Sequence, residues 1–138
     1  MLLRFQVLRL EAMHLRARLA LASADGSEQE RRLRITEDLA QKLAKEKMAW
    51  SDPLAALLRA GVAKKRGDES KALILISQAI DGLELANMEL YATAARLRLG
   101  EMIGGDHGAE LIFAAEDWMR KQQIKNTAAF ANMLAPGF

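Results

Sequence analysis

The fold is decided by "PLAALLRAGVAKKRGDESKALILISQAIDGLELA" (residues 53–86), which contains two helix-forming segments joined by one short turn. Pro53 suits the first position of a helix, where its missing N–H leaves no hydrogen bond unmade. Gly67 is of the residue type that most often ends a helix, and Asp68 is a preferred N-cap for the next helix. Because the turn is so short, the two segments must run antiparallel. The stretch therefore predicts a helical hairpin.

The Gly-Asp turn recurs along the chain. Gly105 and Asp106 repeat it 38 residues later, and Asp25 with Gly26 forms a looser version. Helical hairpins that repeat at about 40 residues are typical of α-solenoids. We therefore expect a single all-α domain of about seven helices, in which antiparallel hairpins stack as a short solenoid. The hairpins are predicted at about residues 2–48, 53–86 and 88–122, and a C-terminal capping helix at about 126–135.

The composition of the chain supports an all-α class. Its 138 residues are enough for one domain, and 51% of them are hydrophobic and 28% charged. Residue types that favour helices dominate, while β-branched and aromatic residues are sparse. No apolar run is long enough to cross a membrane, and charged residues interrupt the N-terminal segment that a signal peptide would need. We therefore expect a cytoplasmic protein without a membrane partner.

The central hairpin resembles a degenerate tetratricopeptide repeat. That family places small residues and a turn glycine at fixed positions, and the hairpin has them at Ala60, Gly67, Ala72 and Ala79. Three further family positions, usually Trp, Tyr and Pro, are occupied by Ala56, Ala63 and Glu84. The resemblance implies stacked hairpins whose groove binds a segment of a protein or peptide partner.

The C-terminal stretch "EDWMRKQQIKNTAAFANMLAPGF" (residues 116–138) carries a second resemblance. It is similar to the extreme C-terminus of large bacterial signalling proteins, in which a serine/threonine kinase or nucleotide-binding ATPase domain precedes a helical-repeat array. No kinase or ATPase motif occurs in this sequence, so the resemblance implies a regulatory tail without the enzyme. We expect Phe130, Met133 and Leu134 to cover the open face of the last hairpin beside Trp118.

The sequence offers no catalytic or metal-binding cluster. Cysteine is absent, which excludes disulfides, thiolate metal ligands and cysteine nucleophiles. Glu11 and His14 have the Glu-x-x-His spacing of di-iron bundles, but such a site needs a second copy, and His107 stands alone in a glycine-rich turn. No nucleophile and base can be paired. We therefore predict a non-enzyme with no catalytic residues, no metal and no cofactor.

Basic side chains give the sharpest candidate site. Arg9 and Arg16 lie seven residues apart on one face of the first predicted helix. If the first helices of successive hairpins line one concave side, basic residues of later hairpins join them there. The alternative is an ordinary solvated surface. The predicted partner-binding residues are Arg9, Arg16, Lys64, Lys65, Arg96 and, on the same argument, Arg98.

The residues and the resemblances leave two functions open. The first is a protein–protein interaction module that binds an acidic protein or peptide segment, as the hairpin repeat indicates. The second is a nucleic-acid-binding helical domain that uses a basic face, as the arginine-rich N-terminal helices suggest. The net charge is only +2, from 20 basic and 18 acidic residues, and no helix-turn-helix or RNA-binding motif is present. Nucleic acid is therefore the weaker alternative.

The first predicted helix carries two adjoining apolar rows, so it should need neighbours on more than one side. One row recurs at spacings of three and four residues, at Phe5, Leu8, Ala12, Leu15, Leu19 and Ala22, and the other consists of Leu3, Val7, Leu10, Ala17 and Leu21. A short solenoid leaves the apolar faces of its end hairpins without a neighbour. We therefore expect either a homo-oligomer formed through this helix or dependence on sequence upstream of it.

Overall fold

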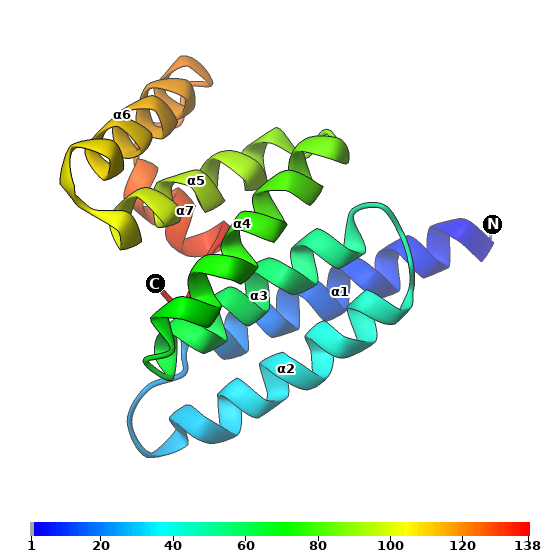
Figure 1. Ribbon diagram of the computed structural model, residues 1–138. Helices are drawn as coiled ribbons and strands as arrows, with labels where there is room; N and C mark the ends of the chain where they lie inside the picture. The colour runs from blue at the N-terminus through cyan, green and yellow to red at the C-terminus, as the bar shows by residue number, and fades with distance from the viewer. Residues whose placement is uncertain (1) are drawn as a thin grey trace.

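The computed structural model describes the backbone of residues 2–138 and the side chains of residues 4–138. Over this range the chain is all-helical, with seven α-helices and one 3₁₀ turn, which confirms the predicted class (Figure 1). None of the described helices combines the length and apolarity needed to pass through a membrane. In chain order the elements are α1 (Leu2–Ala22), η1 (Gly26–Glu28), α2 (Gln29–Lys45), α3 (Ser51–Lys65), α4 (Glu69–Leu85), α5 (Glu89–Ile103), α6 (Gly105–Lys121) and α7 (Thr127–Leu134).

Helices α1 to α6 form three hairpins that stack in chain order. Within the hairpins α1 packs on α2, α3 on α4 and α5 on α6. The joints between hairpins are formed by α2 with α3 and by α4 with α5. The array runs from α1 and α2 at one end to α6 at the other (Figure 1). The predicted architecture of stacked antiparallel hairpins is therefore confirmed.

Small side chains permit the close approach of the two helices in the central hairpin. Ala60 of α3 and Ala72 and Ala79 of α4 have no exposed surface. A Cβ atom on Gly82 would lie 2.8 Å from the Cβ atom of Pro53, so the far ends of these helices also touch. Because none of these helix positions carries a large side chain, the two backbones can pack at short range.

The turns have the geometry that the sequence indicates, with one difference. Gly67 has a φ of 82°, a left-handed conformation that glycine adopts without strain. Asp68 Oδ1 accepts a hydrogen bond of 3.1 Å from a backbone N–H in the first turn of α4. Helix α3 begins at Ser51, ahead of Pro53, because Ser51 Oγ accepts a hydrogen bond from Met48 N and donates one to Met48 O, each 2.9 Å long.

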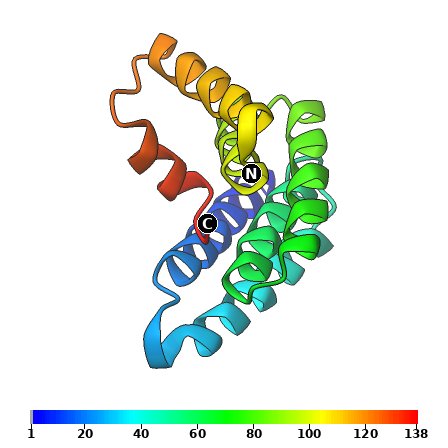
Figure 2. The same cartoon turned by 60° about the vertical axis from the view of Figure 1, so that its left-hand side comes forward.

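The C-terminal segment (residues 127–138) packs on the concave side of the last hairpin and also reaches the first hairpin. Helix α7 packs mainly against α5 and α1. Figure 2 shows it in the opening of the curved array, between α6 and α1. Met133 is 55% exposed, whereas Leu134 is buried. The segment therefore contacts the last hairpin through α5 and α6, although the exposed Met133 takes little part, and it also closes the concave side of the array.

Two arginines, one on the first helix of the first hairpin and one on the first helix of the last hairpin, fix the position of the C-terminal segment. Arg98 Nε of α5 donates a hydrogen bond of 2.9 Å to Ala135 O. Arg18 Nη1 of α1 donates one of 2.9 Å to Met133 O. A Cβ atom on Gly61 of α3 would lie 2.5 Å from the backbone of the segment, so only glycine leaves room there. The segment is therefore held by α1, α3 and α5 together.

Candidate functional site

Most of the predicted basic residues are paired with carboxylates of the same chain. Arg16 is the exception, since it is exposed and makes no ion pair with any side chain of residues 4–138. Partly exposed ion pairs contribute about 0–1 kcal/mol each, so their main effect here is to neutralise charge. The pairs are Arg9 with Glu46 at 2.6 Å, Lys64 with Glu69, Lys65 with Asp25 at 2.9 Å, and Arg96 with Glu84 and with Glu89, the last at 2.9 Å.

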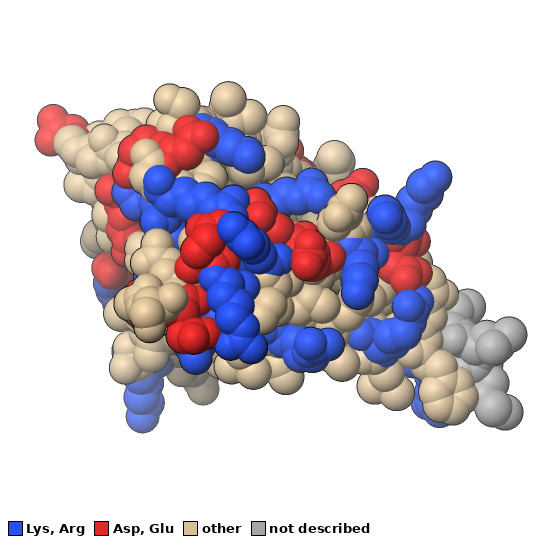
Figure 3. Space-filling view, turned by 90° about the horizontal axis from the view of Figure 1, so that it is seen from below, with Lys and Arg blue, Asp and Glu red and all other residues tan. Residues whose placement is uncertain are grey.

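These basic residues do not form one concave basic groove. The structure distributes them over α1, α3 and α5 and surrounds them with acidic partners from other elements. Of the predicted residues, Arg98 lies on the concave side, where it and Arg18 bind backbone carbonyls of the C-terminal segment. Figure 3 shows basic and acidic side chains interleaved on the face that lies below the array in the view of Figure 1. Pairing across elements therefore neutralises most of the charge that the predicted groove would present, and binding by these residues stays a prediction.

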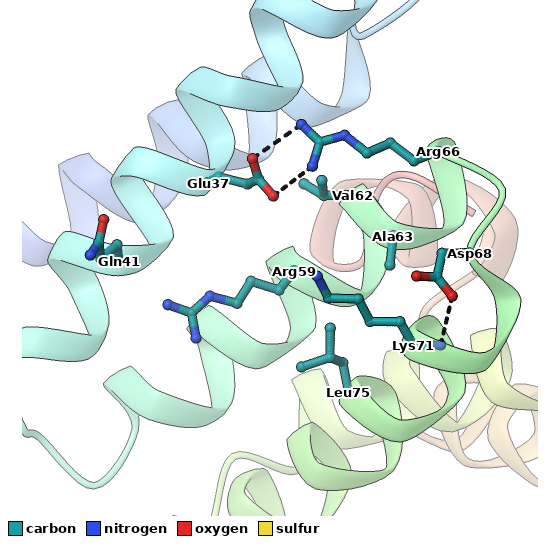
Figure 4. A pocket seen from close by; sticks show the side chains of 9 residues that line it. All are labelled: Glu37, Gln41, Arg59, Val62, Ala63, Arg66, Asp68, Lys71 and Leu75. Atoms are coloured by element: carbon teal, nitrogen blue, oxygen red, sulfur yellow. Dashed lines mark hydrogen bonds and ion pairs between the residues drawn. The ribbon is translucent and has the colours of Figure 1, made fainter.

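A large open cleft lies instead between α2 and α4, with α3 as its floor (Figure 4). Two adjoining pockets of about 640 and 270 Å³ share Arg59 and Leu75 and form one groove, which we call the α2–α4 groove. Spacings of three and four residues place each set of lining residues on one helix face. The floor carries Asp52, Ala56, Arg59 and Ala63, and the walls carry Glu37, Gln41 and Ala44 of α2 and Lys71, Leu75, Gln78 and Gly82 of α4.

The acidic groups beside Arg66 are already bound within the chain. Glu37 accepts hydrogen bonds of 2.7 and 3.1 Å from Arg66 (Figure 4). Glu30 accepts one of 2.8 Å from Arg66 Nη2. The hydrogen bonds to Glu37, and next those to Glu30, raise the pKa of Arg66, and the bond from Arg66 lowers the pKa of Glu30. Arg59 and Lys71, by contrast, make no ion pair with any carboxylate of the described residues.

Arg59 and Lys71 both extend into the open space of the groove. Figure 4 shows Arg59 reaching from α3 toward α2, and Lys71 reaching from α4 into the same cleft. The floor on either side of Arg59 is formed by Ala56 and Ala63, whose methyl groups leave the groove open. Leu75 adds an apolar wall. The groove therefore offers two cations above a shallow apolar floor, an arrangement that suits an amphipathic segment with carboxylates.

The next hairpin has a groove of the same construction, with a volume of about 270 Å³. Its floor residues on α5 have the spacing of residues 52, 56 and 59 on α3, and its wall residues on α6 have the spacing of residues 75, 78 and 82 on α4. Arg96 therefore corresponds to Arg59, and Trp118 to Gly82. The larger Trp118 side chain narrows this second groove. Its floor carries Glu89, Thr93 and Arg96, and its wall carries Leu111, Ala114 and Trp118.

The two corresponding arginines differ in their partners. Arg96 is held by Glu84 from the end of α4 and by Glu89 from its own helix, the latter at 2.9 Å. Asp52 takes the place of Glu89 in the first groove, but it forms no ion pair with Arg59 within the described structure. Its side chain is one methylene shorter, which reduces its reach along the helix. The first groove thus contains Arg59, which corresponds to Arg96, but it lacks the two carboxylates that bind Arg96 in the second groove.

The turn geometry identifies which residue of α2 corresponds to Glu84. Each of these helices ends in a left-handed residue, Lys47 with a φ of 52° after α2 and Asn87 with a φ of 56° after α4. Lys47 N donates to Ala44 O at 3.4 Å, and Asn87 N donates to Glu84 O at 3.1 Å. Ala44 therefore stands where Glu84 stands, and its methyl group leaves Arg59 without the second carboxylate.

A further pocket of about 320 Å³ opens between α1, α3 and the start of α5. His14 lines it and packs edge-on against Tyr91, with 5.5 Å between the ring centres. Burial, assisted by the charge of Arg18, lowers the pKa of His14 to about 3, so its imidazole is neutral near pH 7. No set of three or more acidic or histidine side chains that could hold a metal ion occurs in the part of the chain that the structure describes. His14 is a neutral packing group here.

Sequence reasoning missed Arg59 and Lys71 as site residues. Arg59 is the one charged residue of "PLAALLRAGVA" (residues 53–63), and a lone arginine in an apolar helical run is a usable signal. Lys71 has no such signal, since it stands among other charged residues in the first turn of α4. The absence of carboxylates near Arg59 depends on helix packing and could not be read from the sequence.

No protein-family model, curated protein or solved structure matches this chain. The internal repeat supplies the comparison that homologues would otherwise give, because it shows the same groove once with and once without its carboxylates.

Proposed function

We propose that the chain is a non-catalytic interaction module whose α2–α4 groove binds an acidic segment of a protein partner. One observation carries the proposal: Arg59 lies in an open groove without a carboxylate, whereas the corresponding Arg96 is held by two. A guanidinium group binds a carboxylate through two parallel hydrogen bonds. A Glu or Asp side chain of the partner would bind Arg59 in the first groove, as Glu84 and Glu89 bind Arg96 in the second groove.

The shape of the groove supports a helical or extended ligand. The groove follows α3 over several turns, from Asp52 to Ala63. A helix laid along it would present side chains every three or four residues, which matches the spacing of Ala56, Arg59 and Ala63. Such a ligand would bury an apolar face on the alanines and direct its carboxylates toward Arg59 and Lys71.

The two resemblances support the same class of function. A tetratricopeptide-like array is a scaffold for binding segments of other proteins, and a groove along its helices fits that role. The likeness of residues 116–138 to the C-termini of large bacterial signalling proteins supports a regulatory place in such a system. We infer a helical-repeat part, or a relative of that part, that recruits a partner for an enzyme located elsewhere.

Nucleic acid is a weaker fit for the charge distribution. A duplex is bound by rows of Lys and Arg that face its phosphates. Here five of the six basic residues first chosen as a site are paired with carboxylates, and acidic groups interleave with basic ones on the face shown in Figure 3. Those carboxylates would repel phosphates, which favours a protein ligand.

A peptide array tests this function. Acidic peptides are screened together with copies in which every Glu and Asp is replaced by Gln and Asn, and the dissociation constant of the best probe is measured by fluorescence anisotropy. We expect the acidic probe to bind and its amide copy not to bind. Arg59→Gln should weaken the affinity about tenfold, or 1.4 kcal/mol, while Arg16→Gln, which removes an unpaired arginine outside the groove, should leave it unchanged.

Two results would speak against the proposal. If the acidic and amide probes bind equally, or if Arg59→Gln keeps full affinity, the groove is not the site of an acidic ligand. A duplex DNA probe is included in the same assay. Binding of the duplex at about 150 mM salt, lost on the same substitution, would replace the protein ligand by the nucleic-acid alternative.

A further inference from the structure

The outer face of α1 is apolar and uncovered. Its residues Phe5, Leu8, Leu15 and Leu19 are 66%, 60%, 48% and 61% exposed. These are the large members of the row predicted from the sequence, and the structure places that row away from the core. Contiguous exposed apolar side chains on a helix mark an interaction surface. This surface is separate from the α2–α4 groove.

The internal joints show what normally covers the first helix of a hairpin. Helix α3 is covered by α2, and α5 is covered by α4, so the second helix of one hairpin packs on the first helix of the next. Among the described residues α1 has no helix in that position. The natural cover for α1 is therefore the second helix of another hairpin.

Both internal joints also carry the same kind of ion pair. At the first joint Glu37 of α2 pairs with Arg66 at the end of α3, at 2.7 Å. At the second joint Glu84 of α4 pairs with Arg96 of α5. In each case the second helix supplies the carboxylate and the following first helix supplies the arginine. A helix that covers α1 should accordingly be acidic, because α1 presents exposed arginines beside its apolar row.

Helix α6 has the properties of such a cover. It is the second helix of the last hairpin, and its outer face carries Phe113, which is 66% exposed. Asp106 and Glu110 are exposed on the same side, and Asp117 is half-exposed. Glu116 and Asp117 pair with Arg120 and Lys121, their own i+4 neighbours, and such surface pairs are weak and exchange readily. Because α7 docks on the concave side, it does not seal this face.

We propose that copies of this chain associate head to tail, with α6 of one copy covering the outer row of α1 of the next. The contact would continue the array by repeating its internal joint. Arg4 and Arg16, which have no ion-pair partner within the described structure, would face the carboxylates of α6. The contact is heterologous, so each copy keeps one free end and chains longer than a dimer can form. A single helix-on-helix joint is small, so the association should be weak and concentration-dependent.

A symmetric pair of α1 helices fits the charges less well. In the antiparallel register that sets Phe5 against Leu19 of the second copy, Arg9 comes close to Arg16 of the second copy. Like charges at this range repel. The stack on α6 opposes arginines with carboxylates instead, and this difference decides between the two arrangements.

Variants that block one end of the array at a time test the proposed head-to-tail association. Leu8→Glu/Leu15→Glu blocks the α1 end, and Phe113→Glu blocks the α6 end. All three side chains are exposed, so the variants should keep the wild-type circular dichroism spectrum and Tm. By sedimentation velocity, the mass of the wild type should rise with concentration beyond that of a dimer. Each variant alone should remain monomeric, and an equimolar mixture should form a 1:1 dimer through its two intact ends.

Other outcomes would overturn the proposal. Self-association of Phe113→Glu at the wild-type level would indicate a symmetric α1 pair. A wild type that stays monomeric at every concentration would show that α1 is covered by something other than a second copy, and association only with anionic lipid vesicles would identify a membrane surface. Arg16→Glu serves as a second α1-end variant that keeps the apolar row, and an unchanged association constant for it would contradict the role of charge.

Discussion

At the scale of single residues, the molecule contains its own comparison. Arg59 and Arg96 lie at corresponding places on the floors of two similar grooves. Glu84 and Glu89 neutralise Arg96, whereas Ala44 and the shorter Asp52 leave Arg59 unpaired. One methyl group in place of a carboxylate thus separates a closed ion-pair site from an open one.

Supplying the missing carboxylate should close the first groove. Ala44→Glu places an acidic group where α4 has Glu84, within reach of Arg59. We expect the free energy of unfolding in urea to rise by about 0.5–1 kcal/mol, as for a partly exposed ion pair, and the affinity for the acidic peptide to fall. Ala44→Gln is the control because Glu and Gln have similar helix propensity. Equal stability and equal affinity of the Glu and Gln variants would contradict the assigned correspondence.

His14 should give the fold a specific pH dependence. Its pKa falls from 6.5 to about 3 on folding, so protons bind the unfolded chain more readily than the native one. The native state therefore has full stability above pH 6.5 and loses it as the pH falls toward 3. Between about pH 7 and about pH 5 we expect the free energy of unfolding to drop by about 1–2 kcal/mol.

Urea unfolding at these two pH values measures the effect of His14. His14→Gln should remove most of the drop, whereas His107→Gln, at an exposed helix start, should retain it. The interval from pH 7 to pH 5 lies above the ordinary pKa values of carboxyl groups, so titration of Asp and Glu contributes little to the measured change. The same slope in the wild type and in His14→Gln would show that burial of this imidazole does not set the pH dependence.

At the scale of elements, the sequence predicted the helices better than their docking. Turn residues such as Gly67 and Asp68 act locally, so the hairpin boundaries could be read directly. The position of α7 could not, because it depends on Arg98 and Arg18 reaching carbonyls far away in the chain. The pairing of the predicted basic residues could not be read for the same reason: Lys65 meets Asp25 across 40 residues, and no local pattern shows that contact.

The docking of the C-terminal segment should depend on Arg98. This side chain is 5% exposed and binds Ala135 O, so its removal leaves a buried carbonyl without a donor. We expect Arg98→Ala to lower the free energy of unfolding by about 2–3 kcal/mol and to speed hydrogen exchange in residues 131–135. Arg120→Ala, which removes an exposed arginine of α6, should change stability by less than about 0.5 kcal/mol. Unchanged exchange in residues 131–135 of Arg98→Ala would mean that other contacts hold the segment.

At the scale of the whole molecule, three stacked hairpins give surfaces with different roles. The concave side is occupied by the C-terminal segment, so it is not open to a partner while that segment stays bound. The α2–α4 groove on another side is open and carries Arg59 and Lys71, which form no ion pair among the described residues. The ends of the array present the apolar row of α1 and the acidic face of α6. Partner binding and self-association can therefore occur at the same time on separate surfaces.

The most direct test of the central claim is to map the binding of the acidic peptide by NMR chemical-shift changes over the whole chain. We predict shifts that follow the α2–α4 groove, in residues 37–44, 52–63 and 71–82, with the largest change at the side-chain Nε–H of Arg59. Residues of α6 and α7 should stay unperturbed. Shifts concentrated on the concave side, with release of residues 127–138, would contradict the account, as would saturable binding that leaves Arg59 unchanged.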